Sequence, residues 1–240
     1  MKRIFLLLSL SLIYFESSAQ NKIIDDPNAQ VRALNNSFHA IQVSSAIDLY
    51  LSQSNQESIA VSAADKEDIP HIVTEVDNGV LIIRSDSKSW FRWVKGNRKL
   101  KAYVSFRNID RLSASGASDI HIQGTIAVTN LDVHLSGASD VKGDLKVNDL
   151  SIEQSGASDA TITGTATNAI ITASGASDVK AYDFVTENCT ARASGASDIY
   201  ITVNKELNVH AIGASDVGYK GTAVIRDLHT SGASSVSKKG

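Results

Sequence analysis

Six aspartates recur at nearly equal spacing in the second half of the chain, and a row of carboxylates could bind Ca²⁺, which prefers oxygen ligands. Each aspartate ends a Gly-Ala-Ser-Asp tetrapeptide, and successive copies lie 18 to 21 residues apart. A seventh copy, beginning at Gly232, ends in Ser235 instead of aspartate. The recurring residues are Asp119, Asp140, Asp159, Asp178, Asp198 and Asp216.

Two interpretations of this row stay open. In register, neighbouring carboxylates would lie about 5 Å apart, so repulsion of about 1 kcal/mol in water would grow several-fold in less polar surroundings. The row therefore needs backbone N–H partners or cations. We favour bonding of each aspartate to amides of its own turn, because the hydroxyl of Ser235 replaces a turn acceptor more readily than a metal ligand. The alternative is a Ca²⁺ ladder; no other cofactor is expected.

A second group of residues combines aromatic rings with positive charge between Lys88 and Lys101. This stretch holds both tryptophans, six basic residues and no acidic residue. Rings beside cations suit stacking on a glycan or contact with an anionic lipid surface. The structural alternative is a hairpin around Gly96 whose tryptophans cover one end of the fold. The candidate binding residues are Trp90, Phe91, Arg92, Trp93 and Lys95.

The residue patterns of common enzymes are absent from the chain. It has no Gly-x-Ser-x-Gly, no His-Glu-x-x-His, no phosphate-binding loop and no dinucleotide fingerprint. The single cysteine, Cys189, falls in a column otherwise held by Leu and Ala, which predicts a core residue and not a nucleophile. A polysaccharide-cleaving β-helix would need acidic or basic residues gathered in a cleft of long loops. The repeats leave little room for such loops, so we expect no catalytic activity.

The repeat that carries the aspartates also predicts the fold. Apolar residues alternate with polar ones on both sides of each glycine, as at Leu131, Val133 and Leu135. This period of two is typical of strands with one buried face. A unit of about 19 residues cannot bury that face alone, so the copies must stack on one another. The sequence therefore predicts an all-β chain in which residues 113–240 form a parallel β-helix, or solenoid, with about 19 residues per coil.

Two further polar columns accompany the repeat and have structural interpretations. The serine two positions after each glycine should stack in a hydrogen-bonded row. Asparagine or aspartate stands seven positions before the glycine in four copies, which suits a corner that each coil repeats. These corner residues are Asn130, Asp149, Asn168 and Asn188.

The chain before the repeat has a different organisation. Residues 1–20 have a basic start, an apolar run and small residues after it, which predict a signal peptide. The run is too short for a membrane-spanning helix of roughly 20 residues, and no later stretch resembles one. Residues 21–36 form a polar lead. Residues 37–112 contain several alternating stretches and an Asp77-Asn78-Gly79 turn signal, which predict a β-rich segment that caps the solenoid.

Together, the signal-type start, the β-rich lead and the repeated Ser-Gly-Ala-Ser-Asp turns resemble the head GIN domain family, whose members are described as putative autotransporter adhesins. The resemblance covers roughly residues 37–237. It implies a right-handed β-helix and an exported location. It supplies no catalytic residues.

These observations favour a non-catalytic, adhesin-like or structural module of the cell envelope or surface. We expect it to be exported to the periplasm, the outer membrane surface or the medium, with a glycan or another envelope component as its partner. The formal net charge of −3 provides no basic surface for nucleic acid. The alternatives are a carbohydrate-active β-helix enzyme and a structural spacer without a ligand.

Overall fold

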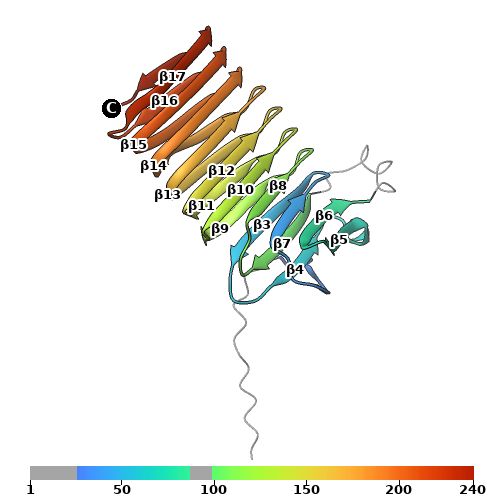
Figure 1. Cartoon of the computed structure of the whole chain (residues 1–240). Helices are drawn as coiled ribbons and strands as arrows, with labels where there is room; N and C mark the ends of the chain where they lie inside the picture. Colours follow the sequence, from blue (N-terminus) through green and yellow to red (C-terminus); the bar gives the residue numbers. More distant parts are fainter. Residues whose placement is uncertain (1–25, 87–98) are drawn as a thin grey trace, which may run out of the picture.

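The protein is a β-solenoid. The computed structural model describes residues 26–86 and 99–240, so the predicted signal peptide lies outside the described residues. The solenoid has about seven turns spaced about 19 residues apart, which confirms the predicted fold (Figure 1). Within the described ranges, no helix has the length and apolarity needed to cross a membrane.

The repeat region forms two parallel sheets joined at the Gly-Ala-Ser-Asp turns. We call the strands that lead into these turns the entry sheet and the strands that follow them the exit sheet. Each strand pairs with the equivalent strand of the next coil. Val133 therefore pairs with Ile152 in the entry sheet, and Val141 pairs with Ala160 in the exit sheet. In β13, β14 and β15 one long strand serves both sheets. The strands are β8 (Arg111–Ala114), β9 (Ile120–Ala127), β10 (Asn130–Leu135), β11 (Val141–Lys146), β12 (Asp149–Gln154), β13 (Asp159–Ala173), β14 (Asp178–Gly195), β15 (Asp198–Gly213), β16 (Asp216–Lys220), β17 (Val224–Gly232) and β18 (Ser235–Lys238).

The N-terminal strands continue both sheets, but not in sequence order. In the entry sheet β2 lies between β6 and β8, and in the exit sheet β3 lies between β7 and β9. The first coil of the chain is thus inserted between two coils that come later in the sequence. The elements are β1 (Gln30–Arg32), β2 (Ala40–Val43), β3 (Ile47–Gln53), β4 (Ser58–Ser62), the 3-10 helix η1 (Lys66–His71), β5 (Ile72–Asp77), β6 (Val80–Ser85) and β7 (Leu100–Phe106).

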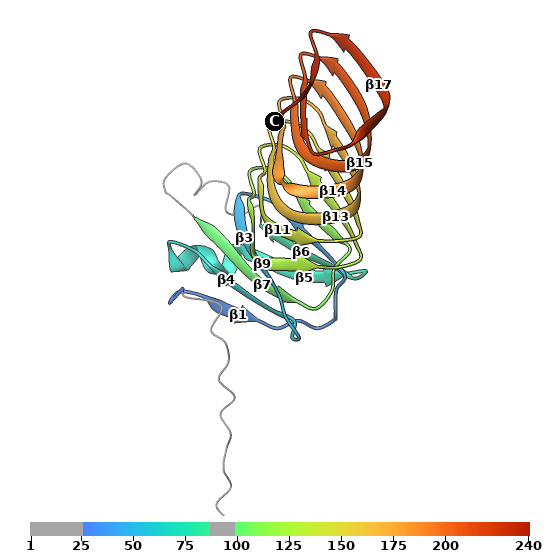
Figure 2. The same cartoon turned by 90° about the vertical axis from the view of Figure 1, so that its left-hand side faces the viewer.

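Antiparallel strands close the N-terminal end of the stack. In the entry sheet β5 pairs antiparallel with β6, while in the exit sheet β4 pairs antiparallel with β7 and β1 with β4. Figure 2 shows the coils as stacked loops with these strands at one end and the C-terminal strands at the other. The β1 strand lies in the polar lead, so the lead contributes to the cap. Antiparallel capping protects a strand edge that could otherwise pair with another chain.

The core lies between the two sheets and consists of columns of like side chains. Ile152 and Ile171 are 1% and 0% exposed, whereas Ile170 points outward and is 49% exposed. Cys189 belongs to the same core, as the repeat pattern predicts. Burial raises the pKa of its thiol to about 12, so the thiolate that a nucleophile requires is scarce at neutral pH.

Glycine is required at the turn between the sheets. Gly156 has a φ of +84°, in the left-handed region that favours glycine. The turns of neighbouring coils also lie in direct contact, because the Ala157 amide donates to the carbonyl oxygen of Gly137 at 2.8 Å. A Cβ on Gly156 would overlap that same oxygen. Both the backbone angle and the adjacent coil therefore exclude a side chain.

Candidate functional site

The aspartate row forms a ladder on the outer face of the exit sheet. Its hydrogen bonds run between coils: Oδ1 of Asp119 accepts from the amide of Asp140 at 3.3 Å, and Oδ1 of Asp140 accepts from the amide of Asp159 at 3.0 Å. The same bond joins Asp159 to Asp178 and Asp198 to Asp216. The predicted bonding of each carboxylate within its own turn is wrong, because parallel stacking places the amide of the next coil within reach.

The ladder also continues beyond the six motif aspartates at both ends. The hydroxyl of Ser235 donates to Oδ1 of Asp216 at 2.6 Å, so the final copy keeps the contact without a carboxylate. At the other end, Asp48 precedes Leu49, which pairs with Ile120, so Asp48 extends the row below Asp119. Sequence reasoning missed Asp48 because it lies in the inserted first coil and lacks the motif. Burial raises the pKa of Asp119, and the nearby charges of Asp140 and Asp48 raise it further.

The serines of the motif form a second, buried ladder. The amide of Ser139 donates to Oγ of Ser158 at 3.3 Å, and the amide of Ser158 donates to Oγ of Ser177 at 3.4 Å. Oγ of Ser158 in turn donates to the carbonyl oxygen of Ser155. The predicted hydrogen-bonded row of serines is present, and its complete burial gives it a structural role.

The corner residues are also linked from coil to coil. The Asn168 side-chain amide donates to Oδ1 of Asp149 at 2.7 Å, and that of Asn188 donates to Oδ1 of Asn168 at 3.0 Å. The side chains of these polar ladders hydrogen-bond to the neighbouring coil and so hold the coils in register. Groups that make these bonds are less available to a ligand.

The structure does not provide a ligand-binding geometry for either predicted site, the Ca²⁺ ladder or the aromatic and basic group. Across residues 26–86 and 99–240, no group of three or more His, Cys, Asp or Glu side chains is placed to hold a metal ion. The Ca²⁺ ladder therefore stays a prediction. The aromatic and basic candidates Trp90, Phe91, Arg92, Trp93 and Lys95 lie outside the described residues.

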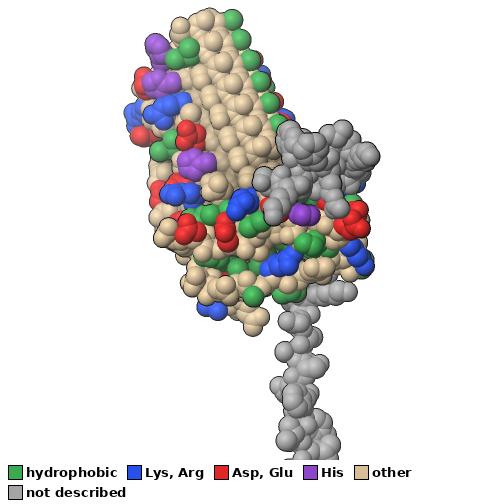
Figure 3. Space-filling view, turned by 90° about the vertical axis from the view of Figure 1, so that its right-hand side faces the viewer, with side chains coloured by type: hydrophobic (Ala, Val, Ile, Leu, Met, Phe, Trp, Pro, Cys, Tyr) green, Lys and Arg blue, Asp and Glu red, His purple; other side chains and the backbone are tan. Residues whose placement is uncertain are grey.

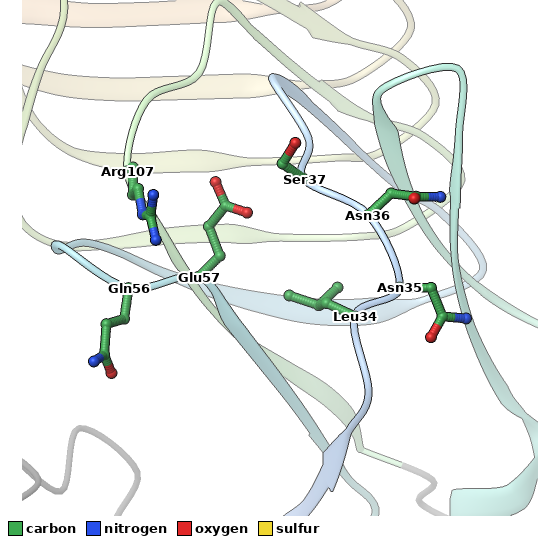
Figure 4. Close-up of a pocket in the computed structure, with 7 residues that line it drawn as sticks. All are labelled: Leu34, Asn35, Asn36, Ser37, Gln56, Glu57 and Arg107. Carbon is green, nitrogen blue, oxygen red and sulfur yellow. The ribbon is translucent and has the colours of Figure 1, made fainter.

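A polar cleft of about 480 Å³ opens beside the cap (Figure 4). Three segments that are distant in sequence meet there: the β1–β2 connection, the β3–β4 loop and the residue that follows β7. Figure 4 shows Arg107 and Glu57 approaching from one side, and Leu34 and Ser37 from the other. We call this site the cap cleft. Its lining residues are Leu34, Asn35, Asn36, Ser37, Gln56, Glu57 and Arg107.

Hydrogen bonds from neighbouring residues fix the backbone on one side of the cap cleft. The side-chain amide of Gln53 donates to the carbonyl oxygens of Arg107 and Ala127, at 3.0 Å each. Oγ of Ser54 donates to the carbonyl oxygen of Gln56 at 2.8 Å, and Oγ of Ser105 donates to the same oxygen at 2.9 Å. The loop and the end of β7 are thus held in place before a ligand binds, which lowers the entropic cost of binding.

The chemistry of the cap cleft suits a ligand with many hydroxyl groups. Arg107 provides up to five N–H donors, Glu57 provides acceptors, and the Asn and Gln amides provide both. Leu34 adds an apolar contact. The lining contains one carboxyl group, whereas most glycoside hydrolases use a pair that flanks the scissile bond. The cleft therefore has the groups to bind a sugar but not that pair of acids.

A smaller hollow of about 390 Å³ lies on the outer face of the entry sheet. Nδ1 of His134 lies 3.3 Å from Oε2 of Glu153 there, and four serines complete much of the lining. In the upper part of Figure 3, histidine and charged side chains lie along the left side of an uncharged band. Glu153 is the single acidic residue that lines this hollow, just as Glu57 is the single acidic residue that lines the cap cleft.

An antiparallel cap and polar ladders at the turns define a capped parallel β-solenoid. The chain belongs to the family described as "putative auto-transporter adhesin, head GIN domain", whose model matches residues 37–223. This match confirms the resemblance that the turn motifs indicate.

Solved structures share the fold. A putative adhesin from Bacteroides fragilis superposes with a TM-score of 0.78 at 20% identity, covering 88% of this chain and 96% of that one. A putative lipid binding protein from Parabacteroides distasonis gives 0.69 at 18%, with 90% and 98% covered. A putative adhesin from Parabacteroides merdae gives 0.66 at 16%, again with 90% and 98% covered. No protein with a curated description matches the chain.

Proposed function

We propose that this protein is an exported, non-catalytic module of the cell envelope or surface that binds a glycan in the cap cleft. The observation that carries the proposal is one open cleft in which Glu57 and Leu34 point toward each other from opposite sides and Arg107 lies beside Glu57 (Figure 4). Such groups make directional bonds to sugar hydroxyls, and Leu34 can contact the apolar face of a ring. The adhesin description of the family supports a binding role.

The proposed location follows from the predicted signal peptide in residues 1–20. A β-solenoid without disulfides suits an exported protein if packing and hydrogen bonding supply its stability. The ladders of Ser158 and Asn168 are of this kind, because they tie each coil to the next. Cell fractionation followed by surface proteolysis tests the location.

A glycan microarray tests the binding function. We expect the protein to bind a defined set of glycans, and Glu57→Gln and Arg107→Ala each to weaken that binding by about tenfold or more, because each removes a charged hydrogen-bonding group. Glu75→Gln is the matched control. It makes the same acid-to-amide change in β5, where Glu75 pairs with Arg84 and does not line the cleft.

Melting temperatures of all three variants should stay close to that of the parent. If no glycan is bound, or if the cleft variants bind as well as the control, the cap cleft is not a glycan site.

A further inference from the structure

The outer face of the exit sheet carries an aromatic cluster where the repeat departs from its usual length. The coil between Gly175 and Gly195 has one residue more than the usual 19. The pairing of β13 with β14 shifts by one residue between Thr161 and Gly164 to accommodate it, and the pairing of β14 with β15 shifts between Ala181 and Val185. In this bulge Tyr182 faces outward. A bulge that re-aims a side chain is a frequent feature of binding sites.

Tyr182 meets Tyr200 of the next coil, and both rings extend over a glycine. The ring centroids lie 5.3 Å apart with an interplanar angle of 44°. A Cβ on Gly218 would lie 2.5 Å from Oη of Tyr182 and 2.8 Å from Cδ1 of Tyr200. The absence of a side chain at Gly218 therefore lets both rings lie along the sheet. Tyr200 is in register with Gly218, and both tyrosines keep part of their surface exposed.

Polar groups surround the two rings. Nζ of Lys220 lies 4.7 Å from the ring centroid of Tyr182, within the range of a cation–π contact. The hydroxyl of Tyr200 donates to Oδ2 of Asp198 at 3.0 Å. Burial raises the pKa of Tyr200 to about 12, with a further contribution from Asp198, so this phenol keeps its proton at neutral pH. Each carboxylate oxygen has two lone pairs, so Asp198 can also accept from a ligand.

We propose that Tyr182, Tyr200 and Lys220 form a second binding site, which takes the apolar face of a neutral pyranose ring while Asp198 accepts from its hydroxyls. The two tilted tyrosine rings offer a sugar both ring surface and hydroxyl groups. The aspartate ladder runs beside the rings, so like-charge repulsion disfavours an acidic sugar. This site does not depend on the cap cleft, because none of its residues lines that cleft.

Saturation-transfer difference NMR tests the site with four neutral probes: maltotetraose, cellotetraose, chitotetraose and xylotetraose. With saturation in the aromatic region, we expect transfer to ring protons of at least one probe. Tyr182→Ala and Tyr200→Ala should each weaken its binding by about tenfold. Tyr200→Phe, which keeps the ring but loses the bond to Asp198, should retain most of it.

Two control variants distinguish binding at this site from binding elsewhere on the protein. Tyr50→Ala removes a half-buried tyrosine from a different stack, with Tyr103 and His121, and should leave binding intact. Arg107→Ala alters the cap cleft alone and should also leave transfer to the bound probe intact. Absence of transfer to any of the four probes would overturn the proposal. So would binding that survives both alanine changes at Tyr182 and Tyr200 in variants that keep the parental melting temperature.

Discussion

At the scale of single residues, the raised pKa of Asp119 links the aspartate ladder to stability. Burial and the neighbouring carboxylates disfavour the charged form in the folded state. A group whose folded pKa is raised above its unfolded value costs stability above the folded pKa, and that cost disappears as pH falls through it. We expect Asp119→Asn to raise the free energy of unfolding at pH 7 by about 0.5 kcal/mol or less.

Urea unfolding at pH 7 and at pH 3.5 measures this effect. The amide of asparagine keeps an oxygen that can accept from Asp140, so the contact between coils survives. The gain in the free energy of unfolding should be smaller at pH 3.5, where Asp119 of the parent binds a proton. A variant that is less stable than the parent at pH 7 would contradict the prediction.

The response to calcium separates the two interpretations of the ladder. A bound ion would stabilise the folded state by about 2.7 kcal/mol at a hundredfold excess over the dissociation constant. Because four of the ladder carboxylates already accept an amide from the next coil, we expect millimolar Ca²⁺ and chelator to leave the melting temperature unchanged. A rise of more than a few degrees would establish the aspartates as a Ca²⁺ site.

The turn glycines should be the positions least tolerant of substitution. Gly156→Val combines a positive φ with overlap against the carbonyl oxygen of Gly137, so we expect a loss of about 3 kcal/mol or more. Thr161→Val on the outer face of the exit sheet should change stability by about 0.5 kcal/mol or less. Thermal unfolding of both variants measures the difference. Equal losses of stability would show that the turn does not require glycine at position 156.

At the scale of strands, adjacent isoleucines in β13 provide a matched test of the buried columns. Ile171→Asp places a charge without a partner between stacked coils, at a cost of several kcal/mol that is comparable with the stability of a domain. We expect an insoluble or unfolded protein. Ile170→Asp makes the same change at a side chain that is 49% exposed and should fold. If the two variants melted alike, the assignment of faces would be wrong.

Much of the strand pattern could be predicted from the sequence, because each coil repeats its own local signal. Alternation around Val133 and Ile152 identifies the buried faces, and the turn motif fixes the register. The insertion of β2 and β3 between later strands could not be predicted in this way. A local pattern shows that a strand has one buried face, but it does not show which strand lies beside it.

The candidate sites were harder to predict for a related reason. The cap cleft combines Asn35, Gln56 and Arg107 from three connections, and no spacing along the chain relates them. The tyrosine cluster depends on the register shift at Tyr182 in β14 and on Gly218, which lies outside the turn motif. The aspartate ladder is visible in the sequence, but its hydrogen-bond partners become clear only from the stacking of coils.

At the scale of the whole molecule, backbone amides should be best protected against hydrogen exchange in the inserted coil, which is formed by β2 and β3. The strands β2 and β3 have neighbours on both sides, and Leu49 and Ile41 are almost completely buried. In contrast, Leu228 of β17 is 52% exposed although Val209, its partner in β15, is buried. We expect amide exchange to be slowest in β2 and β3 and fastest in β17 and β18, because elements with fewer neighbours open more readily.

Hydrogen exchange with mass spectrometry, read peptide by peptide, measures this gradient. Uniform protection along the stack would show that the solenoid opens as one cooperative unit.

The inserted coil would also give the molecule two unequal ends under mechanical load. Tension on an outer coil can peel it away one hydrogen bond at a time, which needs little force at any moment. Tension on the segment that leads into β2 would have to draw this strand out from between β6 and β8, loading two rows of hydrogen bonds in shear at once. Once the short strand β1 had separated from β4, a chain pulled through its N-terminal segment would resist at β2, while the far coils would yield at lower force.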